Sequence, residues 1–235
     1  MNPGFMYYDL HLHSCLSPCA DEDMSPANIC AMARLKGLDL IALTDHNTGG
    51  NLAACFEAAQ RQGLLFVPGM ELCSKEEVHL LAYFPDVKAA LQMDAAIRPL
   101  LPRANNRPDT FGRQLLMDSG DRVLGEEDAL LIGALDAGLD QLTGMVRSLG
   151  GAAVPAHIHR GYGLIQVLGF LPETPRFYAV EAAPGQQVPE GCLALHNSDA
   201  HQLGMIQERL HSLPAMDVPA LIAALNGQDR APAAG

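Results

Sequence analysis

The sequence contains no tryptophan, and aromatic residues make up only 5% of its 235 residues. Basic residues are also scarce: 15 Lys and Arg stand against 27 Asp and Glu, which gives a formal net charge of -12. This balance argues against a broad surface for long nucleic acids, because such a surface needs a basic stripe. A short nucleotide remains compatible with it, since bound divalent ions would reverse the sign of the charge locally.

Long apolar runs and paired cysteines are missing as well. No stretch is apolar over the length needed to span a bilayer, and the first residues, MNPGF, lack the basic and apolar regions of a signal peptide. Cys15 and Cys19 are close in sequence, but no second pair follows, so buried thiols are favoured over a zinc knuckle. We therefore expect a cytoplasmic protein with reduced cysteines and no membrane partner.

The stretch YDLHLHS at residues 8–14 carries the strongest chemical signal. Its apolar residues predict the first strand of a buried sheet, and a strand repeats every two residues, so Asp9, His11 and His13 leave it on one face. Two imidazoles and a carboxylate converging in a dry core are costly unless a charged group binds them. Zn, Mn and Fe ions take such ligands. A lone H-x-H also occurs by chance in solvated strands, so the interpretation depends on the rest of the chain.

Strand and helix patterns alternate along the first part of the sequence. The residues predict helices at about 27–36, 51–62 and 86–101 and buried strands at 38–43, 64–67 and 78–84. This alternation indicates parallel strands with crossover helices, in an open sheet or a closed barrel. His46 and Glu71 lie at the carboxyl ends of their strands, which is where such folds place their sites.

Residues 102–127 lose this periodicity. We interpret them as an insertion with a small hairpin, 114–117 paired with 122–124, that serves as a lid or binding loop or makes packing or dimer contacts. Beyond it, the pattern predicts helices at 128–137, 140–149, 164–170 and 218–225 and strands at 152–157, 177–181 and 192–195. We expect one domain over residues 1–228 and a disordered tail at 229–235.

Histidines gather at the predicted strands. Six of the nine lie in or just after a strand, as do Glu71 and Asp199; these histidines are His11, His13, His46, His79, His157 and His201. A barrel brings such strand ends together at one mouth. The set exceeds the four or so ligands of a single zinc site, so we infer two or three divalent ions (Zn, Mn or Fe) that share a bridging carboxylate.

Five motifs in order, DLHLHS, TDHN, PGME with a following VHLLAYF, PAH and NSDAH, resemble the PHP (polymerase and histidinol phosphatase) family over nearly the whole chain. The resemblance implies an α/β fold, a distorted (β/α)7 barrel, with a di- or trinuclear metal centre that cleaves phosphoesters. The implied ligands of the first ion are His11, His13, Glu71 and Asp199. Glu71 would bridge to a second ion at His79 and His157, and His46 and His201 would hold a third.

Relatives complete the third site with a His or Asp from the loop after the first motif. Counting back four residues from the helix cap Ser25 gives Asp21, and Cys19 is the alternative because it is soft and close. Asp23 fits better as an exposed charge near a helix N-terminus. His159 stands where relatives often carry an acid or proline, and a polar rim residue is favoured over an extra ligand or proton donor.

Other residues have supporting roles in this interpretation. Asp45 fits a partner that orients an imidazole, and Glu181 fits either that role or a buried, paired carboxylate. Arg160, three residues after His157, is the best-placed cation for binding phosphate. Weaker candidates are Arg103, Arg107 and Arg113, while His196 and His211 are interpreted as structural and Asn47 and Asn197 as turn residues.

The sequence therefore predicts a hydrolase in which metal-bound water, not a side chain, is the nucleophile for a small phosphomonoester or short nucleotide. Alternatives are a catalytically silent metal-binding PHP module, like those of some polymerases, and a nuclease on short oligonucleotides. An amidohydrolase usually bridges its metals with a carboxylated lysine, and none of Lys36, Lys75 and Lys88 is well placed for this. No G-x-S-x-G motif supports a serine hydrolase. The oligomeric state is not predicted.

Overall fold

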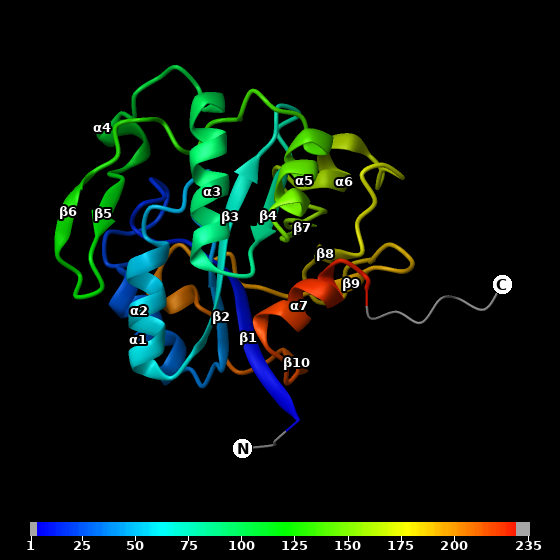
Figure 1. Cartoon of the computed structure of the whole chain (residues 1–235), viewed down its shortest axis with the longest axis horizontal. Helices are drawn as coiled ribbons and strands as arrows, with labels where there is room; N and C mark the ends of the chain where they lie inside the picture. Colours follow the sequence, from blue (N-terminus) through cyan, green and yellow to red (C-terminus); the bar gives the residue numbers. More distant parts are fainter. Residues whose placement is uncertain (1–3, 229–235) are drawn as a thin grey trace.

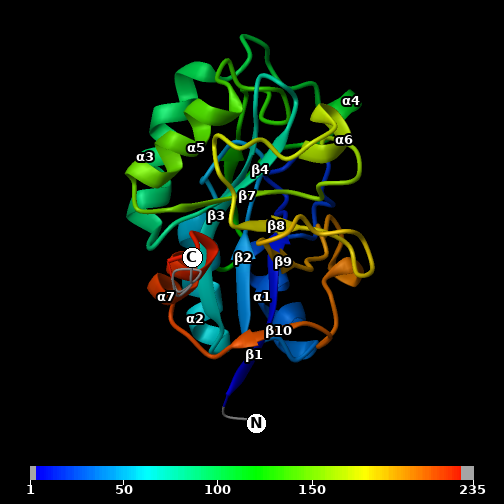
Figure 2. The ribbon, with the colours of Figure 1, turned by 90° about the vertical axis from the view of Figure 1, so that its right-hand side faces the viewer.

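The computed structural model describes residues 4–228 and is built around a curled six-stranded sheet with the order β10-β1-β2-β3-β4-β7 (Figure 1). The strands are β1 (Phe5–Leu12), β2 (Leu40–Leu43), β3 (Leu65–Cys73), β4 (His79–Tyr83), β7 (Ala152–Pro155) and β10 (Ser212–Pro214). A parallel pair, β8 (Ala179–Glu181) and β9 (Leu193–Leu195), lies beside β7 (Figure 2). The sheet and its pair form a curled half barrel, which confirms the predicted α/β class.

Strand direction follows the length of the connections. β1, β2 and β3 are parallel and are joined by helices, as the alternation predicts. β4 is antiparallel to β3, because residues 74–78 alone connect them and a parallel return needs a crossover of roughly a dozen residues. The prediction of parallel strands is therefore wrong at β4, and a ring of seven β/α units stays a prediction.

Helices cover both faces of the sheet. Their bounds are α1 (Pro26–Leu35), α2 (Leu52–Gln62), α3 (Val87–Ile97), α4 (Pro108–Phe111), α5 (Leu139–Ser148), α6 (Leu164–Leu168) and α7 (Val218–Leu225), with 3-10 turns at Arg98–Leu100 and Leu203–Met205. The N-termini of α1 and α3 are capped by Ser25 and Asp86, whose side chains accept from backbone N–H groups three residues later. Gly63 ends α2 in the left-handed conformation, at φ 67°.

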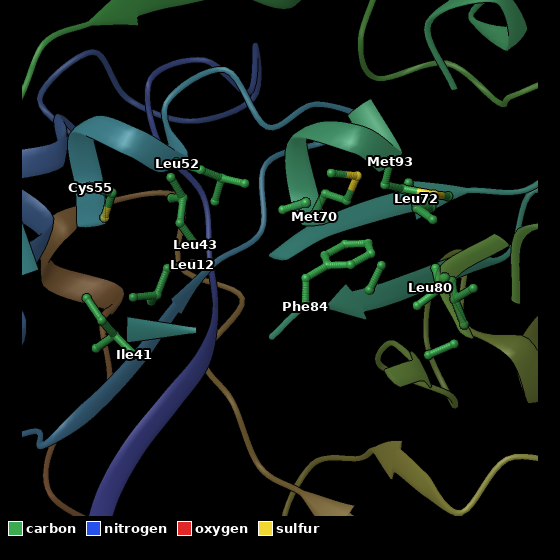
Figure 3. Close-up of a cluster of buried hydrophobic side chains, with 14 of the residues drawn as sticks. Leu12, Ile41, Leu43, Leu52, Cys55, Met70, Leu72, Leu80, Phe84 and Met93 are labelled. Carbon is green, nitrogen blue, oxygen red and sulfur yellow. The ribbon is translucent and has the colours of Figure 1, made fainter. Parts of the chain in front are cut away.

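Alternate residues of each strand supply two separate cores. In β2, Ile41 and Leu43 belong to a large cluster shared with α1, α2, α3 and α5, whereas Leu40 and Ala42 face a second cluster that α7 covers. Figure 3 shows part of the first cluster, where side chains of α2 and α3 meet those of β1 to β4. Burial on both faces explains why these strands read as continuous apolar runs rather than as alternating patterns.

The insertion folds back onto the first motif. Its predicted hairpin is confirmed as β5 (Leu115–Met117) paired with β6 (Val123–Glu126). Gly112, at φ 102°, lies so close to the loop after β1 that an added Cβ would come within 2.0 Å of the Pro18 carbonyl oxygen. Only glycine fits this approach, so α4 and the hairpin are held against residues 14–24.

The helix predicted at 128–137 is wrong, and the short edge strand β10 was not predicted. Residues 128–137 form turns whose carbonyls bind side chains from elsewhere. Asn47 Nδ2 donates to the carbonyls of Leu131 and Gly133, at 2.7 and 2.9 Å, and Gln114 Nε2 donates to that of Ala129 at 2.7 Å. These tertiary hydrogen bonds replace the helical ones, and local apolar spacing does not reveal them.

The Leu10 carbonyl lies where the register of β1 is irregular, and Tyr83 Oη donates to it at 2.8 Å inside the core. We expect Tyr83→Phe to lower the free energy of unfolding by about 1–3 kcal/mol, because it removes the donor of a buried hydrogen bond. Urea denaturation should show a lower midpoint with an unchanged slope. Tyr178→Phe, at a half-buried position, is the control, and equal midpoints for the Tyr83 variant and the wild type would contradict the assignment.

Among residues 4–228, none of the helices is both long and apolar enough to cross a membrane. The predicted tail at 229–235 lies outside the described residues. The single domain over 1–228 stays a prediction.

Candidate metal centre

The carboxyl end of β1 carries His11 and, just beyond the strand, His13. The loop after β9 pairs with this end: Ala200 forms a parallel bridge with the last residue of β1 and accepts the His13 N–H at 3.0 Å. This pairing brings the neighbours of Ala200, Asp199 and His201, beside the two histidines.

The remaining strands deliver their residues to the same edge. A bridge extends β2 and pairs His46 with Glu71 of β3. Because β4 is antiparallel to β3, its first residue, His79, lies where β3 ends. β7 is antiparallel to β4 and ends there too, since Ala156 donates its N–H to the His79 carbonyl at 3.1 Å and His157 follows.

Glu71 lies in the middle of this cluster with a side chain that is 1% exposed. Its Oε2 lies 3.4 Å from His11 Nε2, 3.3 Å from His13 Nε2 and 3.2 Å from His46 Nδ1. Its Oε1 lies 2.8 Å from His79 Nδ1 and 3.2 Å from His157 Nε2. One carboxylate therefore faces five imidazoles, which is the arrangement expected of a bridging ligand.

Within residues 4–228, three groups of side chains could each hold an ion. They are His11, His13, Glu71 and Asp199; then His46, Glu71 and His79; and then His13, His46 and His201, with the ligand atoms of each group within 4.8 Å of one another. The first group coincides with the set implied by the family resemblance. In the second, His46 stands where the resemblance implies His157, although His157 Nε2 also contacts Glu71.

Two buried atoms of the cluster have no hydrogen-bond partner, namely His46 Nδ1 and Asp199 Oδ1. Unpaired buried polar atoms are rare in folded proteins because each costs the loss of its hydration. A coordinated cation would satisfy both atoms. Nitrogen and oxygen donors around a shared carboxylate fit two or three divalent ions, so the residues present fit the metal that the family implies.

The outward-facing nitrogens of the histidines fix their tautomers. His11 Nδ1 lies 2.9 Å from Glu181 Oε2, and His201 Nδ1 lies 2.8 Å from the Asp199 carbonyl oxygen. A carboxylate and a carbonyl only accept hydrogen bonds, so both Nδ1 atoms carry a proton, and Nε2 is the nitrogen that offers a lone pair to a metal ion when the ring is neutral. This pattern of a ligating histidine held by an outer acceptor is typical of metal sites.

Ser17 and Asp45 orient one more imidazole, that of His13, and hold the backbone of His46. Asp45 is 2% exposed and accepts from Ser14 N, Ser14 Oγ and Ser17 Oγ at 2.6–2.7 Å. The Ser17 hydroxyl proton thus points to Asp45, and its oxygen accepts from His13 Nδ1 at 3.0 Å and from the His46 N–H at 3.1 Å. The orienting role predicted for Asp45 therefore acts through Ser17, a residue that the sequence analysis did not single out.

The protonation of the cluster depends on its carboxylates. Burial opposes the charged form of His11, but Glu181, Asp199 and Glu71 outweigh it and raise the pKa of His11 well above its ordinary value. Burial likewise opposes the charge on Glu71, yet His79, His11 and His46 hold the pKa of Glu71 well below its usual range. A metal ion that binds here takes the place of the imidazolium proton, so loading should release protons.

Not every predicted residue reaches the cluster. The two-residue repeat predicts Asp9 on the same face as His11, but its carboxylate accepts hydrogen bonds from Ser198 N, Ser198 Oγ and Gln207 N at 2.6–3.1 Å and anchors the loop around His201. The predicted convergence of Asp9 on the histidines is therefore wrong. The bulge in β1 after Asp9 breaks the two-residue repeat on which the prediction depended.

The two residues considered for completing the third metal site, Asp21 and Cys19, lie in different surroundings in the loop after β1. Asp21 has an exposed side chain, belongs to none of the three groups, and donates its N–H to the His201 carbonyl at 2.9 Å. Cys19 lines the cavity above the cluster together with His46 and His201.

This cavity has a volume of about 450 Å3. Arg160 lines it and donates from Nη2 to Asp199 Oδ2 at 2.8 Å. His159 does not line it, and its Nε2 lies 2.6 Å from the Gln187 carbonyl oxygen. The role of His159 as a polar rim residue stays a prediction.

Backbone strain is concentrated around the cluster. Asn47, His157 and Asp199 have φ values of 49°, 28° and 54°, a region that residues other than glycine rarely adopt. Each of the three is a cluster residue or its direct neighbour. Strain of this kind tends to persist at functional sites, where the surrounding structure holds it.

Residues 9–163 match the model of the family described as the PHP domain, so the chain belongs to this family and the resemblance is confirmed. Among curated proteins, it is 30% identical over 99 residues to a 5'-3' exoribonuclease of Haemophilus influenzae, a match covering 39% of the chain and 35% of that protein. It is 36% identical over 76 residues to a 3',5'-nucleoside bisphosphate phosphatase of Chromobacterium violaceum, covering 31% of the chain and 26% of that protein. The chain thus matches only about a third or less of these relatives.

Solved structures share the fold. A lesion-specific endonuclease from Pyrococcus furiosus superposes with a TM-score of 0.67 at 18% identity, covering 95% of this chain and 56% of that one. A provisionally assigned metal-dependent phosphoesterase from Bifidobacterium adolescentis gives 0.61 at 19% identity, covering 92% and 95% of the two chains. At these sequence identities the structural similarity establishes the fold alone, so the reaction has to be inferred from the residues of the site.

Proposed function

We propose that this protein is a metal-dependent phosphoesterase that hydrolyses a small phosphomonoester or a short nucleotide. The observation that carries the proposal is the contact of one buried carboxylate, Glu71, with five imidazoles at the base of an accessible cavity. Membership of the PHP domain family and the name of the bisphosphate phosphatase relative support it.

The proposed ligand sets are those that the family resemblance implies, and only the first coincides with one of the three groups. His11, His13, Glu71 and Asp199 would hold one ion, and Glu71, His79 and His157 a second. His46 and His201 would hold a third, completed from the loop after β1, where Cys19 is better placed than Asp21 because it lines the cavity. Divalent ions bound in these sets would supply Lewis acidity and an activated water.

The protein's own residues then have distinct tasks. Glu181, Ser17 and Asp45 hold the imidazoles with their lone pairs inward, so the cluster needs little reorganisation when it binds ions or substrate. Arg160 supplies a positive group at the cavity wall, where it can bind a phosphoryl oxygen. The cavity has room for the alcohol portion of a small phosphoester substrate.

We expect Arg160→Ala to raise the KM for a phosphomonoester roughly 10-fold or more, because a charged hydrogen bond to phosphate contributes about 1.5–3 kcal/mol. Arg160→Lys should recover part of the loss, since it keeps the charge without the planar fork. Arg34→Ala, an exposed position on α1, is the matched control. Unchanged KM in the Arg160→Ala enzyme would exclude this arginine from phosphate binding.

The reaction itself is tested with a panel of phosphomonoesters, nucleoside bisphosphates and short oligonucleotides, assayed with Mn-loaded protein. We expect phosphate release by the wild type and none by His201→Ala. A protein shown to hold its ions but inactive on the whole panel would favour the silent metal-binding module. Cleavage of oligonucleotides without release of phosphate from monoesters would favour the nuclease. The names of the exoribonuclease and endonuclease relatives support this alternative.

The formal net charge of -12 favours a small substrate over a long nucleic acid. We also propose a cytoplasmic location, because the six cysteines are spread along the sequence and do not form the closely spaced pattern of a disulfide framework.

A further inference from the structure

Two aromatic side chains in the cavity wall have no task in the reaction proposed above. Tyr162 comes from the loop after His157, and Phe111 is the last residue of α4 in the insertion. In a chain with only 5% aromatic residues, two such rings in one cavity of about 450 Å3 call for an explanation.

Tyr162 is held rigidly but is not buried. Its ring stacks on His79 with centroids 4.8 Å apart and an angle of 14° between the planes. Its carbonyl oxygen accepts the His79 N–H at 2.9 Å, which ties the loop to the first residue of β4. The residue nevertheless remains 51% exposed. With one ring face on His79, the accessible surface belongs largely to the other face and the hydroxyl edge.

The charges around the cavity separate a phosphate end from a neutral end. Arg160 and the imidazole cluster suit an anion. Glu77, two residues before His79, also lines the cavity, and its carboxylate disfavours a second phosphate beside it. The apolar wall formed by Ile132 and Ala134 likewise suits an uncharged group. A substrate that fills this cavity therefore carries a neutral, flat portion as well as a phosphate.

We propose that Tyr162 is a stacking surface for a nucleobase, which makes the substrate class of this centre nucleoside phosphates. The inference builds on the proposed phosphoesterase and adds to it the identity of the alcohol portion. Every base has a π face, and stacking on an aromatic ring discriminates a nucleotide from a sugar phosphate without reading the base edge. Phe111, on the insertion, closes the same cavity with a second apolar ring.

The test compares the binding of an adenosine phosphonate with that of the matching ribose phosphonate, whose C–P bonds resist hydrolysis. Calorimetric titration of Mn-loaded wild type should give a dissociation constant roughly 10-fold lower for the adenosine compound. Tyr162→Ala should remove this preference, and Tyr162→Phe should retain it. Phe170→Ala is the matched control, because Phe170 follows α6, is 62% exposed and lies outside the cavity lining.

Equal affinities for the two compounds in the wild type would overturn the inference. So would an equal loss of both affinities in Tyr162→Ala, since the ring would then only support His79. Phosphate release from adenosine monophosphates, measured separately, reports on the proposed reaction. Selective binding that depends on Tyr162 but occurs without phosphate release would refute the phosphoesterase and leave the nucleobase surface in place.

Discussion

Glu71→Gln should lower phosphate release by a factor on the order of 1,000 or more, because the substitution neutralises the one carboxylate that contacts five imidazoles. The amide keeps the size of the side chain but offers one oxygen instead of two, so it cannot bridge two ions. We expect the loss to appear in metal content as well, measured by elemental analysis after extensive dialysis.

The matched control is Glu77→Gln, the same chemical change at an exposed position in the turn before β4. Its metal content should equal that of the wild type, which separates loss of a ligand from loss of local charge. A Glu71→Gln protein that keeps both its ions and its turnover would show that Glu71 does not bridge the centre.

Asp45→Asn should cost about 10- to 100-fold in metal affinity, even though Asp45 touches no ligand nitrogen directly. Its carboxylate fixes the Ser17 hydroxyl, and Ser17 in turn holds His13 Nδ1 and the His46 backbone. Loosening this chain frees the His13 ring to rotate away from the cluster. Titration with Mn, followed by phosphate release, should show a shifted metal dependence.

Excess Mn distinguishes this positioning role from a general loss of structure. The Asp45→Asn enzyme should regain a substantial part of its rate at high Mn, and Ser17→Ala should show the same dependence. Circular dichroism controls for folding. A variant that loads metal like the wild type, or one that no concentration of Mn restores despite a native spectrum, would contradict the proposed chain of contacts.

Much of the cluster could be predicted because it depends on local patterns. Each histidine and acid lies in a buried strand or just after one, and the strands bring these positions to one edge. Glu71 and Asp199 were found in this way, although β4 runs antiparallel, because its first residue His79 then lies at the same edge. The family motifs supplied the grouping of ligands into sites.

The roles of residues that depend on contacts between distant parts of the chain could not be predicted from the sequence. Ser17 and Asn47 look like ordinary loop residues, yet Asn47 donates to the carbonyls of Leu131 and Gly133 and also accepts from Cys73 N at 3.0 Å. Asp9 was misassigned because a strand's two-residue repeat holds only while the pairing is regular, and β1 bulges after it. No spacing rule reports such a bulge.

Phosphate release before and after removal of divalent ions shows whether the Glu71 cluster acts as a metal centre. Wild-type protein assayed with its preferred ester should lose its activity on treatment with a chelator and regain it when Mn is restored. Undiminished turnover in protein shown by elemental analysis to be free of divalent ions would exclude the Glu71 cluster as a catalytic metal centre.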